Sequence, residues 1–417
     1  MRKIYLGVLA LYIGILAGHA QNNLPVSDTS TYLSRKLKIE EINFVSAYYH
    51  QDGNNSAVTG GLGTENLTDF ANTFDLQLSN HSKKGRKNTL LLELGVDHYS
   101  SASSDMIDPH SISSASRQDT RIYPSINWTK TNEQTGNALG FTASYSHEFD
   151  YQSFGAGFNL TRLSKNKNTQ FDFKALAFLD TWLVILPVEL RPPGYGSGGH
   201  EDKRPLDHKP RNSYSTSFSV SQVINTRLQG SITIEPSYQH GLLATRYQRV
   251  YFNGNFNEGV GPNSDIFNER VENLPDKRYK LPVAVRLNYF LDDRFIIRTY
   301  YRYYMDNWGI TAHTAEIEVP VKITSFVSVS PFYRYNNQIG TRYFAPYGQH
   351  SVNEIYYTSD YDLSTLQSSF FGTGLRLSPP KGVFGNQHIT ALELRFGHYI
   401  RNTGLSSNIL TLHLKFK

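Results

Sequence analysis

The stretch from Arg294 to Asn336 constrains the fold most, because its side chains alternate between apolar and charged. It divides into three consecutive segments, RFIIRTYYRYYMDNW, GITAHTAEIEVPVKI and TSFVSVSPFYRYN. Successive side chains of a strand point to opposite faces of its sheet. In the middle segment, Ala315 and Ile317 share one face, while Glu316 and Glu318 share the other. A sheet with one apolar and one charged face is typical of a transmembrane β-barrel, which meets lipid outside and water inside.

The same period of two recurs along the chain and predicts sixteen strands in all. Their expected limits are 37–50, 67–80, 88–100, 119–131, 138–148, 152–163, 170–181, 213–225, 228–241, 280–291, 294–306, 309–323, 326–337, 366–378, 389–400 and 407–417. The last strand places Leu410, Leu412 and Leu414 on its apolar face, followed by Phe416. This ending resembles the C-terminal signature by which outer-membrane barrels are recognised for assembly, although Lys417 is the final residue.

The connections between these strands fall into two length classes. Short turns follow every even-numbered strand, whereas all the long connections follow odd-numbered strands; they are 51–66, 101–118, 182–212, 242–279 and 338–365. Short turns on one side and long loops on the other, with both chain ends on the short side, are typical of membrane barrels. The sequence therefore predicts an all-β fold, a transmembrane antiparallel up-and-down β-barrel of about 16 strands.

Three prolines interrupt this pattern. Pro236, Pro320 and Pro331 each lie inside an expected strand. Because proline has no N–H to donate to the ladder, we expect a bulge at each of them, or strand limits that differ from the pattern.

The first twenty residues have the features of a secretory signal peptide. A basic start is followed by the apolar stretch 4–16 and by the small-x-small sequence GHA. We expect residues 1–20 to be a signal peptide that is cleaved before Gln21, and residues 21–417 to form a single outer-membrane β-barrel domain. The alternative, an uncleaved anchor helix, is disfavoured because the apolar stretch is shorter than the ~20 residues that span a bilayer.

Composition agrees with an exported membrane barrel. The chain has no Cys, which excludes disulfides and lipoprotein anchoring. Its 41 Lys and Arg and 36 Asp and Glu are scattered along the sequence, which argues against nucleic-acid binding. After the signal peptide, no run of 18 apolar residues offers a membrane helix. We expect the aromatic residues near the long-loop ends of strands to lie at the lipid interface; they are Tyr99, Tyr145, Trp182, Tyr303, Tyr304 and Trp308.

The charged face of the expected barrel carries the candidate functional residues. Tight turns would place Arg298 opposite Glu318 and Glu316 opposite Arg334. One interpretation is a ladder of opposite charges that fills and rigidifies a narrow lumen. The other is a constriction that selects solutes by charge. The candidate lumen residues are Arg298, Arg302, Glu316, Glu318, Arg334, Arg376, Glu393, Arg395 and Lys415, with Glu393 expected near Lys415 and Arg376 on the preceding strand.

Two connections contain residue types that bind metals. Asp52, Asn54 and Ser56 offer oxygen atoms at alternate positions, as calcium loops do, but the glutamate and glycine spacing of such loops is not matched. A plain turn-rich loop is the alternative. The polar tract after Leu190 contains other metal-ligand types, His200, Asp202 and His208. No cofactor is expected.

The connection after Thr181 begins with an apolar segment, Trp182 to Leu190. This segment either continues its strand above the membrane or folds inward and narrows the pore, as constriction loops do in porins. The sequence leaves both alternatives open.

Five phrases of the sequence together resemble a bacterial family catalogued only as a domain of unknown function. They are DGNNSAVTGGLGTE (52–65), SHEFDYQSFG (146–155), YYRYYMDNWGITAHTAEIE (300–318), SVSPFYRYNNQ (328–338) and YTSDYDLS (357–364). The resemblance implies an outer-membrane barrel of diderm bacteria with no assigned activity, over essentially the whole mature chain. Genes of this family often lie beside genes for a flavin transferase and a thioredoxin-like periplasmic protein, which implies envelope redox partners. The resemblance assigns no role to any residue.

These patterns favour a pore or transporter for small solutes in the outer membrane, since an open barrel of this size leaves an aqueous channel. The second interpretation is a non-conducting structural or receptor component whose lumen is plugged by the loops 182–212 or 242–279. The third is an outer-membrane hydrolase, but no G-x-S-x-G, H-E-x-x-H, P-loop or dinucleotide motif is present, so we do not expect an enzyme. Expected partners are outer-membrane lipid, the barrel assembly machinery and periplasmic envelope proteins, while the solute and the oligomeric state are not predicted.

Overall fold

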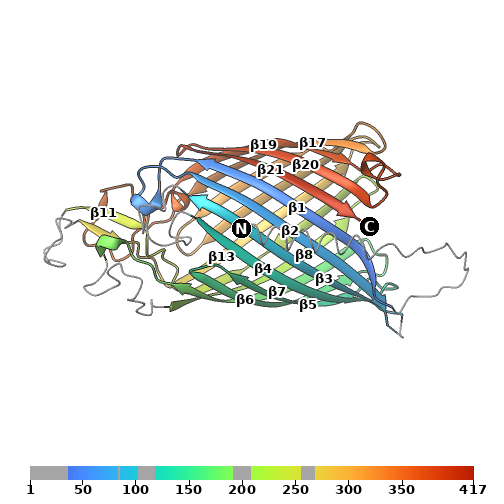
Figure 1. The fold of residues 1–417 in the computed structure, drawn as a ribbon, viewed down its shortest axis with the longest axis horizontal. Coiled ribbons are helices and arrows are strands. Elements are labelled where there is room, and N and C mark those ends of the chain that lie inside the picture. Colours follow the sequence, from blue (N-terminus) through green and yellow to red (C-terminus); the bar gives the residue numbers. More distant parts are fainter. Residues whose placement is uncertain (1–35, 83–84, 102–117, 191–207, 255–267) are drawn as a thin grey trace, which may run out of the picture. The chain divides into compact units, whose positions relative to one another are not determined.

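A computed structural model describes residues 36–82, 85–101, 118–190, 208–254 and 268–417. Their main feature is a large antiparallel sheet that closes on itself (Figure 1). Closure is made by the first and last strands, β1 (Lys38–Asp52) and β21 (Leu405–Phe416), which pair with Tyr48 opposite Leu410. A closed sheet leaves no edge with unpaired backbone groups. The expected all-β barrel is confirmed.

Eighteen strands make up this sheet. Between β1 and β21 they are β2 (Leu67–His81), β3 (Lys87–Ser101), β4 (Gln118–Thr131), β5 (Ala138–His147), β6 (Tyr151–Leu163), β7 (Thr169–Leu183), β8 (His208–Val223), β9 (Leu228–Ile234), β10 (Ser237–Gly241), β13 (Lys277–Phe290), β14 (Ile296–Asp306), β15 (Thr311–Glu318), β16 (Val321–Lys322), β17 (Val327–Ile339), β19 (Leu366–Leu377) and β20 (Ile389–Arg401). Because β9 continues into β10, and β15 into β16, the barrel has sixteen spans, as the sequence predicts.

Proline causes both of these interruptions. Pro236 separates β9 from β10, and Pro320 separates β15 from β16. Their carbonyl groups still accept hydrogen bonds, from the N–H of Thr216 at 3.0 Å and of Ile296 at 3.2 Å respectively. The expectation of an irregularity is confirmed at these two positions. It is wrong at Pro331, which lies inside the unbroken strand β17, opposite Thr373.

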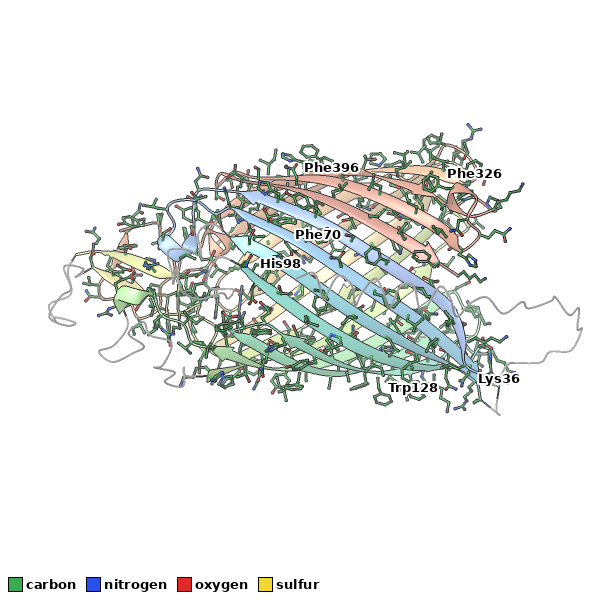
Figure 2. The ribbon with its side chains drawn as sticks, in the orientation of Figure 1. Lys36, Phe70, His98, Trp128, Phe326 and Phe396 are labelled. Carbon is green, nitrogen blue, oxygen red and sulfur yellow. The ribbon has the colours of Figure 1, made fainter. Side chains whose placement is uncertain are left out.

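The outer face of the barrel is apolar. Figure 2 shows Phe70 and Phe396 on the outside of the sheet, where they are 44% and 45% exposed. Tyr301, Ile317 and Tyr333 of the Arg294–Asn336 stretch are likewise exposed, while the charged side chains between them line the interior. Large apolar side chains are stable in this position when hydrocarbon surrounds them. The closed sheet and its apolar outer face are those of a transmembrane β-barrel.

The helical elements of the described ranges are short 3-10 turns: η1 (Ala57–Thr59), η3 (Val188–Leu190), η4 (Tyr361–Leu363) and η5 (Val383–Gly385). Among the described residues, no helix is long and apolar enough to cross a membrane.

Long connections gather at one end of the barrel, and the C-terminus lies at the other end (Figure 1). Two of them form a small separate sheet, in which β11 (Arg249–Asn253) pairs with β12 (Glu269–Val271) and, in parallel, with β18 (His350–Ser351). We call the described parts of the connections 53–66, 184–190, 242–276 and 340–365 the cap. The expected segregation of short and long connections is confirmed.

The apolar segment that follows β7 belongs to the cap. Its residue Ile185, together with Leu183 at the end of β7, is buried against Val58 and Tyr247, which come from two other connections. The strand ends at Leu183, so the segment does not continue as a strand above the membrane. Whether it narrows the pore stays a prediction.

A second apolar cluster joins the cap to the rim of the barrel. Trp308, in the β14–β15 turn, is 2% exposed and packs with Leu243, Ala244 and Leu274. Its indole Nε1 donates to the carbonyl of Lys277 at 3.0 Å. The expectation that Trp308 anchors the lipid interface is therefore wrong, because the cap covers its side chain. It is also wrong for Tyr304, which faces the interior of the barrel and donates its hydroxyl hydrogen to Asp306 at 2.9 Å.

Candidate functional site in the lumen

Charged side chains cross the inner wall of the barrel on β14, β15 and β17. Arg298 lies opposite Glu318, and their side chains form an ion pair of 3.3 Å. Glu316 lies opposite Arg334, with a nitrogen-to-oxygen distance of 2.5 Å. Both pairs have the register that tight turns and strand alternation predict.

A third arginine extends this network. Arg395 on β20 reaches Glu318 at 3.2 Å, so that two guanidinium groups share one carboxylate. The side chain of Arg395 also lies 4.3 Å from the centre of the Phe332 ring. The intervening β19 carries glycine at 372 and 374 on this face, which leaves the space for so long a contact.

Glu393 and Lys415 lie diagonally on the neighbouring strands β20 and β21, close to each other as expected, but no ion pair joins these two side chains. Lys415 forms its ion pair with Glu41 of β1, at 2.5 Å. Glu393 lies directly opposite His413, and Arg376, on the preceding strand as expected, lies opposite Glu393. Glu41 is the partner of Lys415 because closure of the barrel brings β1 beside β21, a neighbour that lies at the far end of the sequence.

A luminal cavity of about 670 Å³ lies at the long-loop end of this wall. Eight strands and the η4 turn supply its lining: Tyr49, Gln51, Arg278, Arg302, Tyr304, Ile310, Ala312, Thr314, Arg334, Asn336, Gln338, Asp362, Leu363, Ser368, Phe370, Tyr399, Arg401, Leu405, Ser407 and Ile409. Of the candidate lumen residues, Arg302 and Arg334 are here. The volume lies in the range of small-molecule sites, and the mixture of aromatic and polar groups is typical of them.

Three charged residues of this cavity are absent from the sequence-based set. Arg278 pairs with Asp306 at 2.6 Å, and Arg401 forms an ion pair with Asp362 of η4. Arg278 and Arg401 fall just outside the expected strand limits, so alternation alone assigns them to loops. Asp362 comes from a connection with no periodicity, and no sequence signal places it in the lumen.

A second luminal cavity, of about 430 Å³, lies on the wall formed by β3 to β8 and β10, and Arg121 and Arg211 are among its lining residues. Nearby, Asp119, Glu148 and Asp150 bring carboxylate oxygens within 4.8 Å of one another. Protein groups already occupy several of these oxygens, because Glu148 accepts from the Tyr99 hydroxyl at 2.9 Å and Asp119 accepts from backbone N–H groups. We read this cluster as structural.

In the part of the chain that the structure describes, the metal candidates belong to no group of three histidine or acidic side chains. Asp52 ends β1 opposite Ser406, whereas Ser56 is buried beside η1. The one group of three carboxylates found in the described ranges is the Asp119 cluster, not this loop. His200 and Asp202 lie outside the described residues, and calcium binding stays a prediction.

The cap contains buried carboxyl groups, among them Glu269 and Glu272. Glu272 is 2% exposed, and its oxygens accept hydrogen bonds from the N–H of Thr245 at 2.6 Å and the hydroxyl of Thr358 at 2.5 Å. Burial, together with repulsion from Asp360, raises the pKa of Glu272 to about 8. Burial and the neighbouring Asp362 raise the pKa of Asp360 to about 6. Glu272 is therefore largely protonated at neutral pH, and it joins separate segments of the cap.

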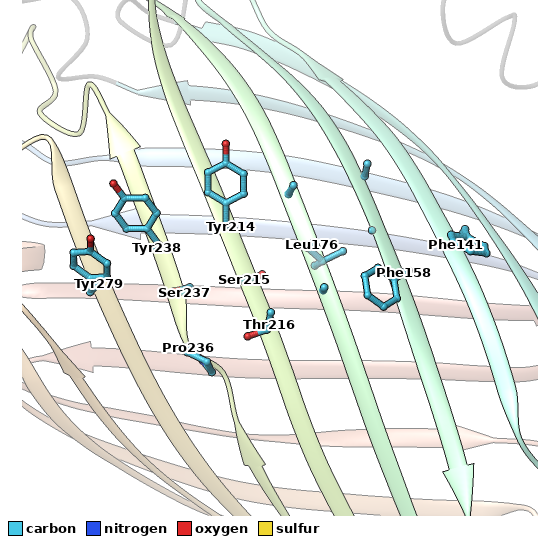
Figure 3. A pocket seen from close by; sticks show the side chains of 14 residues that line it. Phe141, Phe158, Leu176, Tyr214, Ser215, Thr216, Pro236, Ser237, Tyr238 and Tyr279 are labelled. Carbon is cyan, nitrogen blue, oxygen red and sulfur yellow. The ribbon is translucent and has the colours of Figure 1, made fainter.

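An apolar hollow of about 720 Å³ lies on the outer face instead (Figure 3). Its lining includes Phe141 and Phe158 on one side and a row of tyrosines, Tyr214, Tyr238 and Tyr279, on the other. The Tyr238 and Tyr279 rings stack with centroids 4.7 Å apart. This hollow faces lipid, so it takes no part in the luminal site.

Comparisons with known proteins agree with the resemblance read from the sequence. Residues 96–403 match the model of a family described as "Protein of unknown function (DUF3570)". No curated protein matches the chain.

Several solved structures share the architecture at low similarity. OccAB3 of Acinetobacter baumannii has 8% identity and a TM-score of 0.37, covering 91% of this chain and 99% of its own. The outer membrane protein OpdK of Pseudomonas aeruginosa has 8% identity and a TM-score of 0.35, covering 92% of this chain and 99% of its own. OccK9 (OpdG) of the same organism has 10% identity and a TM-score of 0.36, with coverages of 92% and 99%. Similarity at this level supplies neither a substrate nor a site for this chain.

Proposed function

Since the chain belongs to the DUF3570 family, whose function is unknown, we propose from its own geometry that it passes small hydrophilic solutes across the outer membrane. The observation that carries this proposal is the polar luminal cavity of about 670 Å³ inside a closed barrel. A barrel that served only as an anchor would gain nothing from such a cavity. Sixteen spans also leave an interior wide enough for water.

The luminal charges support passage of hydrated solutes. Arg298, Arg334 and Arg395 share two carboxylates within one wall, and their guanidinium groups remain partly exposed to the interior. Ion pairs in such a wet setting contribute little to stability, typically below about 1 kcal/mol. Their placement along the lumen therefore agrees better with selection of solutes than with stabilisation alone.

The cap favours a second function, a non-conducting barrel that acts as a receptor or structural component. Arg249 holds three connections together, because its side chain bonds Glu189, Glu269 and the carbonyl of Val58. Asp362 and Leu363 of another connection line the luminal cavity itself. The sequence analysis expects the loops 182–212 or 242–279 to plug the lumen. If the barrel is non-conducting, the connection 340–365 would be part of this plug.

Conductance of the purified barrel in planar bilayers separates the two functions. Stepwise currents from the wild type would support an open pore. Currents that appear only in Arg249→Ala, a variant that loosens the cap, would support a pore gated by the cap. Silence of both proteins, with intact barrels on heat-modifiability gels, would overturn passage and favour the receptor. Partners in the envelope, and the absence of enzymatic activity, stay predictions.

A further inference from the structure

The luminal cavity is richer in positive than in negative charge. Four arginines line it, Arg278, Arg302, Arg334 and Arg401, whereas Asp362 is the single carboxylate in its lining. Some of these arginines also contact carboxylates that do not line the cavity. The net charge that a solute meets therefore depends on which guanidinium groups are already paired.

Three of the four arginines have carboxylate partners. Arg278 pairs with Asp306, whose side chain is fully buried. Arg334 pairs with Glu316, and Arg401 pairs with Asp362. Each of these contacts offsets one luminal charge and fixes the direction of the guanidinium group.

Arg302 differs from them. Within the described ranges, no carboxylate and no hydrogen-bond acceptor is within bonding distance of its guanidinium group, and its side chain is exposed to the cavity. Its neighbour across the ladder is Thr314, which is followed by Asn336 on the next strand. Arg302 is thus a cation that a solute can reach.

Asn336 supplies a second donor in the same row. Its side-chain oxygen accepts the hydroxyl hydrogen of Thr314 at 2.9 Å, which fixes the amide. The amide nitrogen then faces away from Thr314, with two hydrogens to donate. Two strand spacings of about 4.8 Å separate Asn336 from Arg302, a gap that the long arginine side chain spans.

Apolar groups complete the cavity. Tyr49, Tyr304, Phe370 and Tyr399 line it, together with Ile409. Aromatic faces of this kind pack against the flat or apolar body of a ligand. A small inorganic ion would leave them without a partner.

We propose that Arg302 and Asn336 bind the carboxylate of a small organic anion whose apolar body packs against the aromatic side chains of the luminal cavity. The proposal rests on the proposed passage of solutes, because it names the class of solute that the lumen selects. A guanidinium group binds a carboxylate through two parallel hydrogen bonds, which gives both charge recognition and orientation.

Benzoate is the probe, and inorganic phosphate is the comparison. Benzoate is expected to interrupt the single-channel current of the wild type, and Arg302→Gln is expected to weaken this block at least about tenfold. Asn336→Asp is expected to weaken it similarly, because the new carboxylate would pair with Arg302. The matched control is Arg121→Gln, which removes a positive charge from the second luminal cavity.

Each outcome decides a separate point. Equal weakening in Arg302→Gln and Arg121→Gln would overturn the site in favour of a general positive potential. Phosphate block as tight as benzoate block would overturn the role of the aromatic wall.

Calorimetry of benzoate binding to the barrel in detergent separates the site from passage. Suppose that the wild type binds benzoate but carries no current, and that Arg302→Gln does not bind benzoate. This result would keep the anion site and overturn the pore. Current without any benzoate binding would keep the pore and overturn the site.

Discussion

Replacement of Glu272 by Gln tests how pH acts on the cap. Glu272 ionises with a pKa raised from 4.5 to about 8 by burial and by Asp360, so its charged form is disfavoured in the folded cap. A raised carboxyl pKa gives stability that is fully present at acidic pH and is lost as the pH rises through the folded value. We therefore expect the wild-type cap to loosen between pH 5 and about pH 9.

The size of the effect follows from the same pKa. A change from 4.5 to about 8 is equivalent to a difference on the order of 5 kcal/mol across that interval. The groups that face Glu272 partly offset one another. The hydrogen bonds donated by Thr245 and Thr358 favour the ionised carboxylate, as does Arg246, whose Nη1 donates to the Glu272 carbonyl at 3.1 Å, whereas Asp360 opposes ionisation.

Hydrogen exchange of the Thr245 and Thr358 amides, corrected for intrinsic rates, measures this loosening. Wild-type protection should fall by up to about three orders of magnitude from pH 5 to pH 9. Glu272→Gln should show a much shallower fall, with a loss of about 1 kcal/mol at low pH because an amide has one acceptor oxygen fewer. The control Glu133→Gln, on an exposed short turn, should behave as the wild type. Protection that rises with pH, or a Glu272→Gln slope equal to that of the wild type, would refute the reasoning.

Three further outcomes are expected. Trp308→Ala should lower the free energy of unfolding by about 3–5 kcal/mol, because a buried indole and its contact with the Arg278 guanidinium at 4.4 Å are lost. Urea titrations in lipid measure this loss, and an unchanged free energy of unfolding would place Trp308 at the lipid interface after all. A double-mutant cycle of Glu316→Ala and Arg334→Ala should give a coupling below about 1 kcal/mol, since the Arg334 side chain is 47% exposed, and a value of several kcal/mol would contradict a wet lumen. Gly95→Ala should cost about 1–3 kcal/mol, because a Cβ there lies 2.0 Å from Cε2 of Tyr123; adding Tyr123→Ala should restore part of the loss, and failure to do so would place the strain elsewhere.

Local sequence patterns were enough to predict the barrel and the charged pairs of its inner wall that lie on neighbouring strands. Arg298 and Glu318 lie on one hairpin, so alternation and a tight turn are enough to place them opposite each other. The outward positions of Ile317 and Phe396 follow from the same period of two. These statements need only neighbours along the chain.

What depends on distant parts of the chain was not predictable. Lys415 pairs with Glu41 because the barrel closes, and no local pattern identifies that neighbour. Trp308 is buried by a connection whose residues have no periodicity, so its burial could not be predicted from the sequence. Arg278 and Arg401 lie at strand ends, where the pattern fades and limits are least certain.

The parallel pairing of β11 with β18 has a consequence for the order of assembly. Phe252 and His350, which pair with each other, are separated along the chain by four spans of the wall: β13, β14, β15 with β16, and β17. Contacts between segments so far apart in sequence form late, since loop closure costs entropy before any contact repays it. We therefore expect the small sheet of β11, β12 and β18 to be completed late in folding, after the wall spans that separate β11 from β18 have paired with one another.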